Sequence, residues 1–143
     1  MDEYEQFEND CKTIRKENQL LLDKFEMSLR ESGLTDKTIR NHTQNIDFYI
    51  NEYLVYEEPI EAKNGIDKVS WFMGYWFIKK AMWASSASIK SNAASLKKFY
   101  SFLLSIEMIT KAQLIELKDT IKDEMPEWLE ELEAYDSASM DMW

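Results

Sequence analysis

Few side chains in this sequence could carry out catalysis. His42 is the only histidine and Cys11 the only cysteine, so there is no second histidine for a zinc site, no CxxC redox pair and no intrachain disulfide. His42 follows Ile39 by three residues and precedes Ile46 by four, which places it at the edge of an apolar helical stripe. We expect a packed, hydrogen-bonded histidine rather than a ligand or a base. We therefore expect a protein that is not an enzyme and has no metal or cofactor.

Basic and small polar side chains are more informative, and they gather in two segments. In residues 35–45, a helical period of about 100° per residue puts Lys37, Arg40 and Asn41 opposite or beside the stripe that begins at Ile39. Lysine and arginine reach phosphates, and amide side chains read base edges. This segment is thus a candidate nucleic-acid contact. The alternative is that it forms the solvated back of an amphipathic helix.

The second segment, residues 86–98, has the same plan. Lys90, Lys97 and Lys98 share a helical face with Ser91, on the side opposite the apolar Ile89. Small side chains on that face would let the helix approach a groove of DNA closely. A solvated helix face is again the alternative.

Long helices must position these side chains, because three glycines and two prolines leave few turns. We expect an all-α fold of two helical hairpins. The helices would cover residues 18–32, ending at Gly33, continue from an N-cap at Thr35, cover residues 67–83, and resume after the serine-rich residues 84–88. In both candidate segments the apolar residues recur in steps of seven, four and three: Ile39, Ile46, Ile50 and Tyr53, then Ile89, Leu96, Tyr100 and Leu103.

The C-terminal segment indicates a fifth helix with an acidic surface. The sequence TKAQ, residues 110–113, fits a capping box. Pro126 is expected to interrupt this helix or to start another one. The last seven residues are expected to be frayed.

Most aromatic side chains, Trp71, Trp76 and Trp128 among them, are expected to pack in the core. Phe102 and Trp83 are the expected exceptions. Phe102 falls on the otherwise polar side of the fourth helix, so we expect it to contact the fifth helix or a second chain.

The charge argues against a nucleic-acid partner, because binding DNA depends on cations that meet phosphates and the formal net charge is −10. The charges are unevenly distributed, however. Residues 1–32 carry net −4 and residues 112–143 net −8, whereas residues 33–111 carry net +2. The most apolar stretch meets Lys79 and Lys80 after about ten residues, too early for a membrane span. We expect a soluble, cytoplasmic protein that is not secreted and has no membrane partner.

Several ordered features resemble the N-terminal, SAM-like core-binding domain of tyrosine recombinases and phage integrases. The resemblance lies in Gly33-Leu34-Thr35, in Thr38-Ile39 with its stripe, and in Ser88-Ile89, which leads to Phe99-Tyr100 and Phe102-Leu103. It covers about residues 20–109. It divides the chain into an acidic helical lead (1–19), the SAM-like domain (20–109) and an acidic helical extension with a frayed tail (110–143).

The resemblance implies an orthogonal bundle of two crossed hairpins, four to five helices in all, that clamps a DNA duplex. It implies a non-catalytic protein accessory to DNA integration or recombination, because the chain lacks the catalytic domain of these enzymes. Ser91 and Asn92 stand where the family often has Arg or Lys, so the resemblance implies weak binding of double-stranded DNA. The implied contacts are Lys37, Thr38, Arg40, Asn41, Lys90, Ser91, Asn92, Lys97 and Lys98.

A helical protein-interaction module that has lost DNA binding remains the alternative. Its acidic C-terminal helices would contact a protein partner or a second copy of the chain. A third possibility joins the two, with residues 123–136 folding over the basic face as an intramolecular mimic of DNA. Deleting the chain from Lys111 onward would then strengthen DNA binding.

Overall fold

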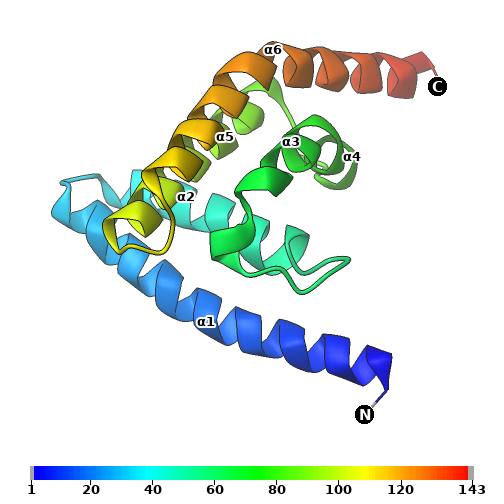
Figure 1. Ribbon diagram of the computed structural model, residues 1–143. Coiled ribbons are helices and arrows are strands. Elements are labelled where there is room, and N and C mark those ends of the chain that lie inside the picture. The colour runs from blue at the N-terminus through cyan, green and yellow to red at the C-terminus, as the bar shows by residue number, and fades with distance from the viewer. Residues whose placement is uncertain (1, 142–143) are drawn as a thin grey trace.

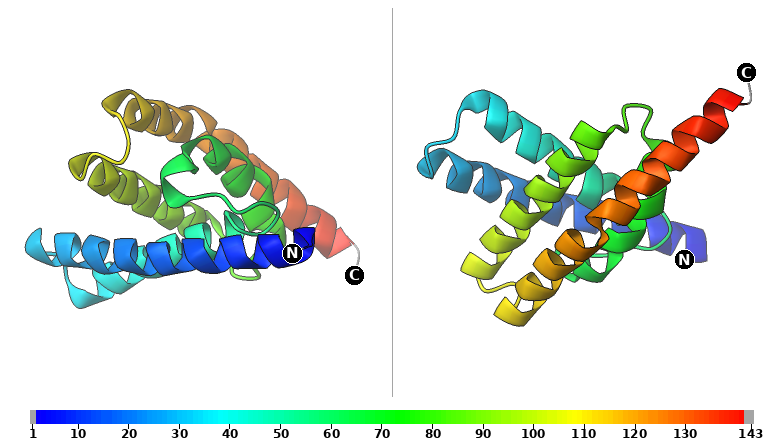
Figure 2. Two further views of the ribbon diagram at one scale, coloured as in Figure 1. Left: turned by 60° about the horizontal axis from the view of Figure 1, so that its bottom comes forward. Right: turned by 90° about the horizontal axis from the view of Figure 1, so that it is seen from above.

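The computed structural model describes the backbone of residues 2–141 and the side chains of residues 2–138, and these residues form an all-α bundle without strands (Figure 1). Two long helices begin and end the chain, and the shorter elements lie between them. The turn between α1 and α2 and the turn between α5 and α6 lie at the same end of the molecule, away from both termini (Figure 2). The α-helices are α1 (Glu3–Glu31), α2 (Asp36–Phe48), α3 (Val69–Trp71), α4 (Phe77–Lys80), α5 (Ser86–Ser105) and α6 (Lys111–Asp141). The other elements are the π-helical η1 (Tyr49–Tyr53) and η4 (Phe72–Trp76), and the 3₁₀ turns η2 (Ala62–Asn64) and η3 (Ile66–Lys68).

The expected signals at the ends of helices are confirmed. Gly33 has φ of 84°, a left-handed conformation that glycine adopts without steric cost, and it closes α1. The Thr35 hydroxyl accepts a hydrogen bond from the Thr38 amide at the start of α2. Ser85 and Ser88 form a reciprocal capping box on α5, and Thr110 and Gln113 do the same for α6. Local hydrogen bonding therefore sets where three of the helices begin.

The expected helix over residues 67–83 is confirmed as an unbroken helical run over residues 66–80, but it is not a regular α-helix and it ends three residues early. A 3₁₀ turn, one α-turn, the π-helix η4 and the short α4 follow one another, and the helical conformation ends at Ala81, where ψ is 114°. The wider π-turn changes the angular spacing of side chains. Trp71, which we expected in the core, is 56% exposed, whereas Phe72 and Met73 are fully buried.

Helix α6 runs through Pro126 instead of ending there. Figure 1 shows its direction changing in this region, as expected where proline removes one helical hydrogen bond and its ring crowds the preceding turn. The helix buries Leu114, Leu117, Trp128 and Leu132 in the main core. Deleting the chain from Lys111 would therefore remove core side chains, and its effect on DNA binding could not be separated from unfolding.

One hydrophobic cluster includes residues from α1 at Leu22 to α6 at Leu132. Phe102 packs against Phe25 of α1 with ring centroids 5.8 Å apart, and it lines a groove together with residues of α6. Its expected contact with the fifth helix stays a prediction. The expected boundary at residue 19 falls inside the unbroken helix α1. The N-terminal half of α1 packs through a separate small cluster of Phe7, Cys11, Ile14 and Val55.

Candidate nucleic-acid interface

Polar side chains join α2 to α5 where the two helices cross. The Nδ1 atom of His42 lies 2.7 Å from the Ser95 hydroxyl, and the Asn45 amide donates to the hydroxyls of Ser91 and Ser95 at 3.0 and 2.9 Å. His42 is 9% exposed, which confirms the expected packed, hydrogen-bonded histidine. These bonds fix the relative position of the two helices that carry the candidate contacts.

Two of the expected contacts belong to the packing of these helices rather than to a free surface. Asn92 is 2% exposed, and its amide donates to the Ser88 carbonyl at 2.8 Å. Because this side chain is almost fully buried, Asn92 packs in the core, and its burial argues against the expected contact with DNA. Ser91 is half-buried and accepts the hydrogen bond from Asn45.

The remaining expected residues are accessible. Thr38 is half-buried, with its hydroxyl accepting a hydrogen bond from the Thr35 hydroxyl at 3.0 Å. The six exposed ones are Lys37, Arg40 and Asn41 on α2, and Lys90, Lys97 and Lys98 on α5.

A groove of about 1000 Å³ lies between the C-terminal part of α1, α5 and the N-terminal half of α6. Its floor is apolar, and four lysines and four serines line it, but no carboxylate does. Sequence reasoning missed Lys118 and Lys122, because only the packing of α6 against α5 brings them beside Lys97 and Lys98. We call this feature the lysine groove. Its lining is Phe25, Ser28, Leu29, Ser32, Lys97, Lys98, Ser101, Phe102, Ser105, Lys118, Ile121, Lys122 and Met125.

Lys98 connects the lysine groove to the crossing of α2 and α5. Burial lowers the pKa of His42 below its ordinary 6.5, and the nearby positive charge of Lys98 lowers it further. Ser95, which bonds to His42 and Asn45 of α2, precedes Lys98 by three residues on α5. The groove-lining Lys98 therefore lies one helical turn from the crossing of α2 and α5.

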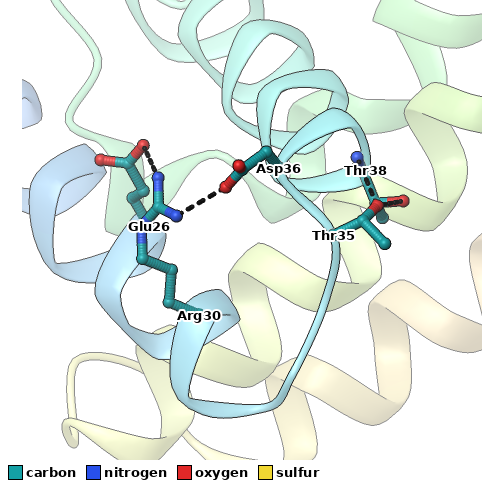
Figure 3. Close-up of polar contacts among 5 residues, drawn as sticks. All are labelled: Glu26, Arg30, Thr35, Asp36 and Thr38. Carbon is teal, nitrogen blue, oxygen red and sulfur yellow. Dashed lines mark hydrogen bonds and ion pairs between the residues drawn. The ribbon is translucent and has the colours of Figure 1, made fainter.

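Arg30, at the end of α1, is held by carboxylates instead of being free for an anion (Figure 3). Its guanidinium donates to Asp36 at 2.7 Å and to Glu26 at 3.4 Å. The longer of these bonds lies within α1, and the shorter one ties the end of α1 to the first turn of α2. Asp36 also places a negative charge at the positive end of the α2 dipole. The ion pair therefore positions the turn and removes one arginine from the accessible positive charge.

Helix α6 separates its charges along its length. Residues 111–122 contain three lysines and two acidic residues, whereas residues 123–141 contain eight acidic residues and no basic one. Past Pro126, Trp128 packs beside Gly74 of η4 and Tyr135 lies under the Lys79 ammonium of α4, 5.2 Å away. This part of α6 covers η4 and α4, so the idea that it folds over the lysines of α5 as a DNA mimic is not supported.

No protein-family model, curated protein or solved structure matches this chain. Among residues 2–141, no helix combines the length and the apolar character that crossing a bilayer requires. The described side chains include no group of three or more His, Cys, Asp or Glu placed to hold a metal ion.

Proposed function

We propose that this chain is a non-catalytic protein that binds double-stranded DNA and resembles the core-binding domains of integrases. The observation that carries the proposal is the lysine groove, which gathers four lysines without a lining carboxylate in a chain of net charge −10. Lys90 is exposed on α5 seven residues before Lys97, on the same helical face, and Lys37 and Arg40 are exposed on α2, which packs against α5. A role accessory to DNA integration or recombination follows from the resemblance.

The binding should be weak and strongly dependent on salt. If the four groove lysines each neutralise one phosphate, the slope of log affinity against log salt is about −3.6. Raising the salt from about 50 to about 200 mM then weakens binding about 150-fold. The remaining acidic surface repels the duplex and keeps the affinity low.

A charge-reversal experiment tests the proposal. Fluorescence anisotropy with a short labelled duplex at about 50 mM salt would compare the wild type with K97E/K98E and with K12E/K16E. Both variants change the net charge by the same amount, but Lys12 and Lys16 lie on the N-terminal half of α1, outside the groove. We expect the groove variant to lose about tenfold or more in affinity and the control to lose much less. Equal losses, or no binding by the folded wild type, would refute the proposal.

His42 provides a second and local readout. A phosphate bound at Lys98 offsets the positive charge that lowers the pKa of His42, so DNA should raise this pKa towards 6.5. The single histidine makes the NMR titration unambiguous. An unchanged pKa in the presence of saturating DNA would place the duplex elsewhere.

The alternative, a helical protein-interaction module, is favoured by the exposed loop between α4 and α5. Met82 is fully exposed and Trp83 is 57% exposed. Large apolar side chains on a surface are typical of contact sites between proteins. A folded wild type that fails to bind DNA would favour this alternative.

A further inference from the structure

A second cavity, of about 260 Å³, lies apart from the lysine groove and has the opposite charge. It opens between the end of η1, the loop after it, η3 and α3. Four aromatic residues and three carboxylates line it, against one lysine. We call it the aromatic pocket. Its lining is Tyr53, Leu54, Tyr56, Glu57, Glu58, Ile60, Asp67, Lys68, Trp71 and Trp76.

The aromatic rings of the pocket are organised around Trp76. Tyr53 stands at 64° to its indole with centroids 5.1 Å apart, and Tyr56 at 69° and 5.6 Å. On other sides Phe48 and Phe72 pack against the same indole at 5.6 and 6.0 Å. Trp76 is therefore held firmly, with two tyrosine rings set steeply against it.

Hydrogen bonds within the protein hold the residues that line the pocket in place. The Tyr53 hydroxyl donates to the Lys68 carbonyl at 3.0 Å, which joins η1 to η3. The amide of Ile60 donates to the Leu54 carbonyl at 3.1 Å and closes the loop between them. Binding a ligand costs less conformational entropy when the side chains of the site are already ordered.

Deeper hydrogen bonds hold the chain that follows the loop. The buried Tyr49 hydroxyl donates to the Gly65 carbonyl at 2.6 Å, and the buried Tyr100 hydroxyl donates to the Ala62 carbonyl at 2.7 Å. Both tyrosines are fully buried. The segment between Ile60 and η3 is therefore anchored to the core.

The electrostatics of the pocket favour a cation. Burial and then the charges of Glu57 and Asp67 raise the pKa of Tyr53 to about 12. These two carboxylates therefore act on the ring that forms one wall. The Lys80 ammonium, which is not part of the lining, lies 5.5 Å from the Tyr56 ring centroid, so this ring attracts a positive charge of the chain itself.

We propose that the aromatic pocket binds an organic cation with a methylated ammonium group. Aromatic faces attract such a cation through their quadrupoles, and its methyl groups contact the rings without losing hydrogen bonds. The carboxylates of Glu57, Glu58 and Asp67 add Coulombic attraction at the mouth. An unmethylated ammonium is more strongly hydrated, so it loses more hydration free energy than a methylated one when it moves between the rings. The cation belongs either to a free small molecule or to a methylated lysine of a peptide, and the proposal is independent of the proposed DNA binding.

Isothermal titration calorimetry on the full chain tests the proposal with defined probes. Choline would be compared with 3,3-dimethylbutanol, which has the same shape without the charge. A trimethyllysine peptide would be compared with the same peptide carrying unmodified lysine. We expect choline to bind at least about tenfold more tightly than its neutral analogue. A trimethyllysine peptide that binds more tightly than choline would identify the peptide as the source, and the reverse order would identify the small molecule.

A matched pair of tryptophans locates the site. Trp71 lines the pocket and is 56% exposed, whereas Trp83 is 57% exposed and lies outside the lining. W71L should weaken choline binding about tenfold, and W83L should leave it unchanged. Circular dichroism would check that both variants are folded. The proposal fails if neither choline nor the trimethyllysine peptide binds at about 10 mM, if the neutral analogue binds as well as choline, or if W83L weakens binding as much as W71L.

Discussion

Replacing Gly65 with alanine should destabilise the protein, although its backbone conformation is ordinary. Gly65 has φ of −91° and ψ of −3°, which alanine adopts without strain. Alanine there would even restrict the unfolded chain and so stabilise the fold by about 0.4–1 kcal/mol. The atoms around Gly65 nevertheless make the substitution destabilising. A Cβ atom at this position would lie 2.5 Å from the Tyr100 hydroxyl, 2.8 Å from Leu54 Cδ1 and 3.3 Å from the Ala62 carbonyl oxygen.

The expected cost has two parts. Inserting a methyl group into a fully packed site costs about 1–3 kcal/mol. Moving the Tyr100 hydroxyl away breaks its 2.7 Å hydrogen bond to the Ala62 carbonyl. This carbonyl keeps the hydrogen bond from the Gly65 amide at 3.1 Å, but the buried Tyr100 hydroxyl loses its partner, which costs about 1–3 kcal/mol. The two costs sum to about 2–6 kcal/mol, so after the gain from the unfolded chain is subtracted we expect G65A to lower the free energy of unfolding by about 1–5 kcal/mol, with a central value of about 3 kcal/mol.

Urea denaturation followed by circular dichroism would measure this change, with G33A as the control. Gly33 has the opposite character, since its φ is +84° but no atom lies within 4 Å of the position that an added methyl group would take. G33A should cost about 1–2 kcal/mol from backbone strain alone. A stabilised G65A protein, or one destabilised less than G33A, would refute the reasoning.

A double-mutant cycle with Tyr100 tests the mechanism. Y100F removes the oxygen that lies nearest to the new methyl group, so G65A should cost less in the Y100F protein than in the wild type. Additive costs would show that the clash with Tyr100 is not the cause.

Three further predictions concern single side chains. Burial and the charge of Lys98 lower the pKa of His42 in the folded protein below 6.5, so on acidification the unfolded chain binds a proton at His42 before the folded chain does. The free energy of unfolding should therefore fall as the pH drops below about 6.5, and above that pH it should not depend on the ionisation of His42. Urea denaturation at about pH 7.5 and 5.5 should show a smaller pH dependence in H42Q. The Trp76 Nε1–H group is buried without a hydrogen-bond partner among the described residues, so W76F removes no hydrogen bond. It should lower the free energy of unfolding by less than the roughly 3–5 kcal/mol that is typical when a buried tryptophan is truncated to alanine, and a loss in that range would contradict the prediction. S85A should cost about 1 kcal/mol through loss of the capping box, and thermal denaturation would measure it.

The sequence predicted those features that depend on residues close together in the chain. Thr35, Ser85 and Thr110 begin helices because each hydroxyl meets an amide three residues on, and Gly33 ends one because few other residues adopt its φ. The burial of His42 could be predicted because it lies beside the apolar helical stripe that begins at Ile39. All of these depend on geometry within one or two helical turns.

Features that depend on tertiary packing were missed or wrong. Lys118 and Lys122 joined the candidate site only because α6 packs along α5. Asn92 follows Ile89 by three residues, on the apolar side of α5, and it was placed in the site by the family resemblance rather than by its own helical position. The π-helical turn of η4 and the exposure of Trp71 just before it have no local signal in the apolar residues around them.

The separation of charge along α6 has a consequence for how the molecule would meet any charged partner. The lysines of α6 lie towards the end with the two interhelical turns, and its acidic residues lie towards the end with both termini (Figures 1 and 2). Such a chain has a large electric dipole moment in spite of its overall negative charge. A polyanion's field would rotate the freely diffusing protein so that its acidic end points away before the surfaces touch. For the proposed DNA binding, productive collisions in dilute salt would then be more frequent than for a protein of the same net charge spread evenly.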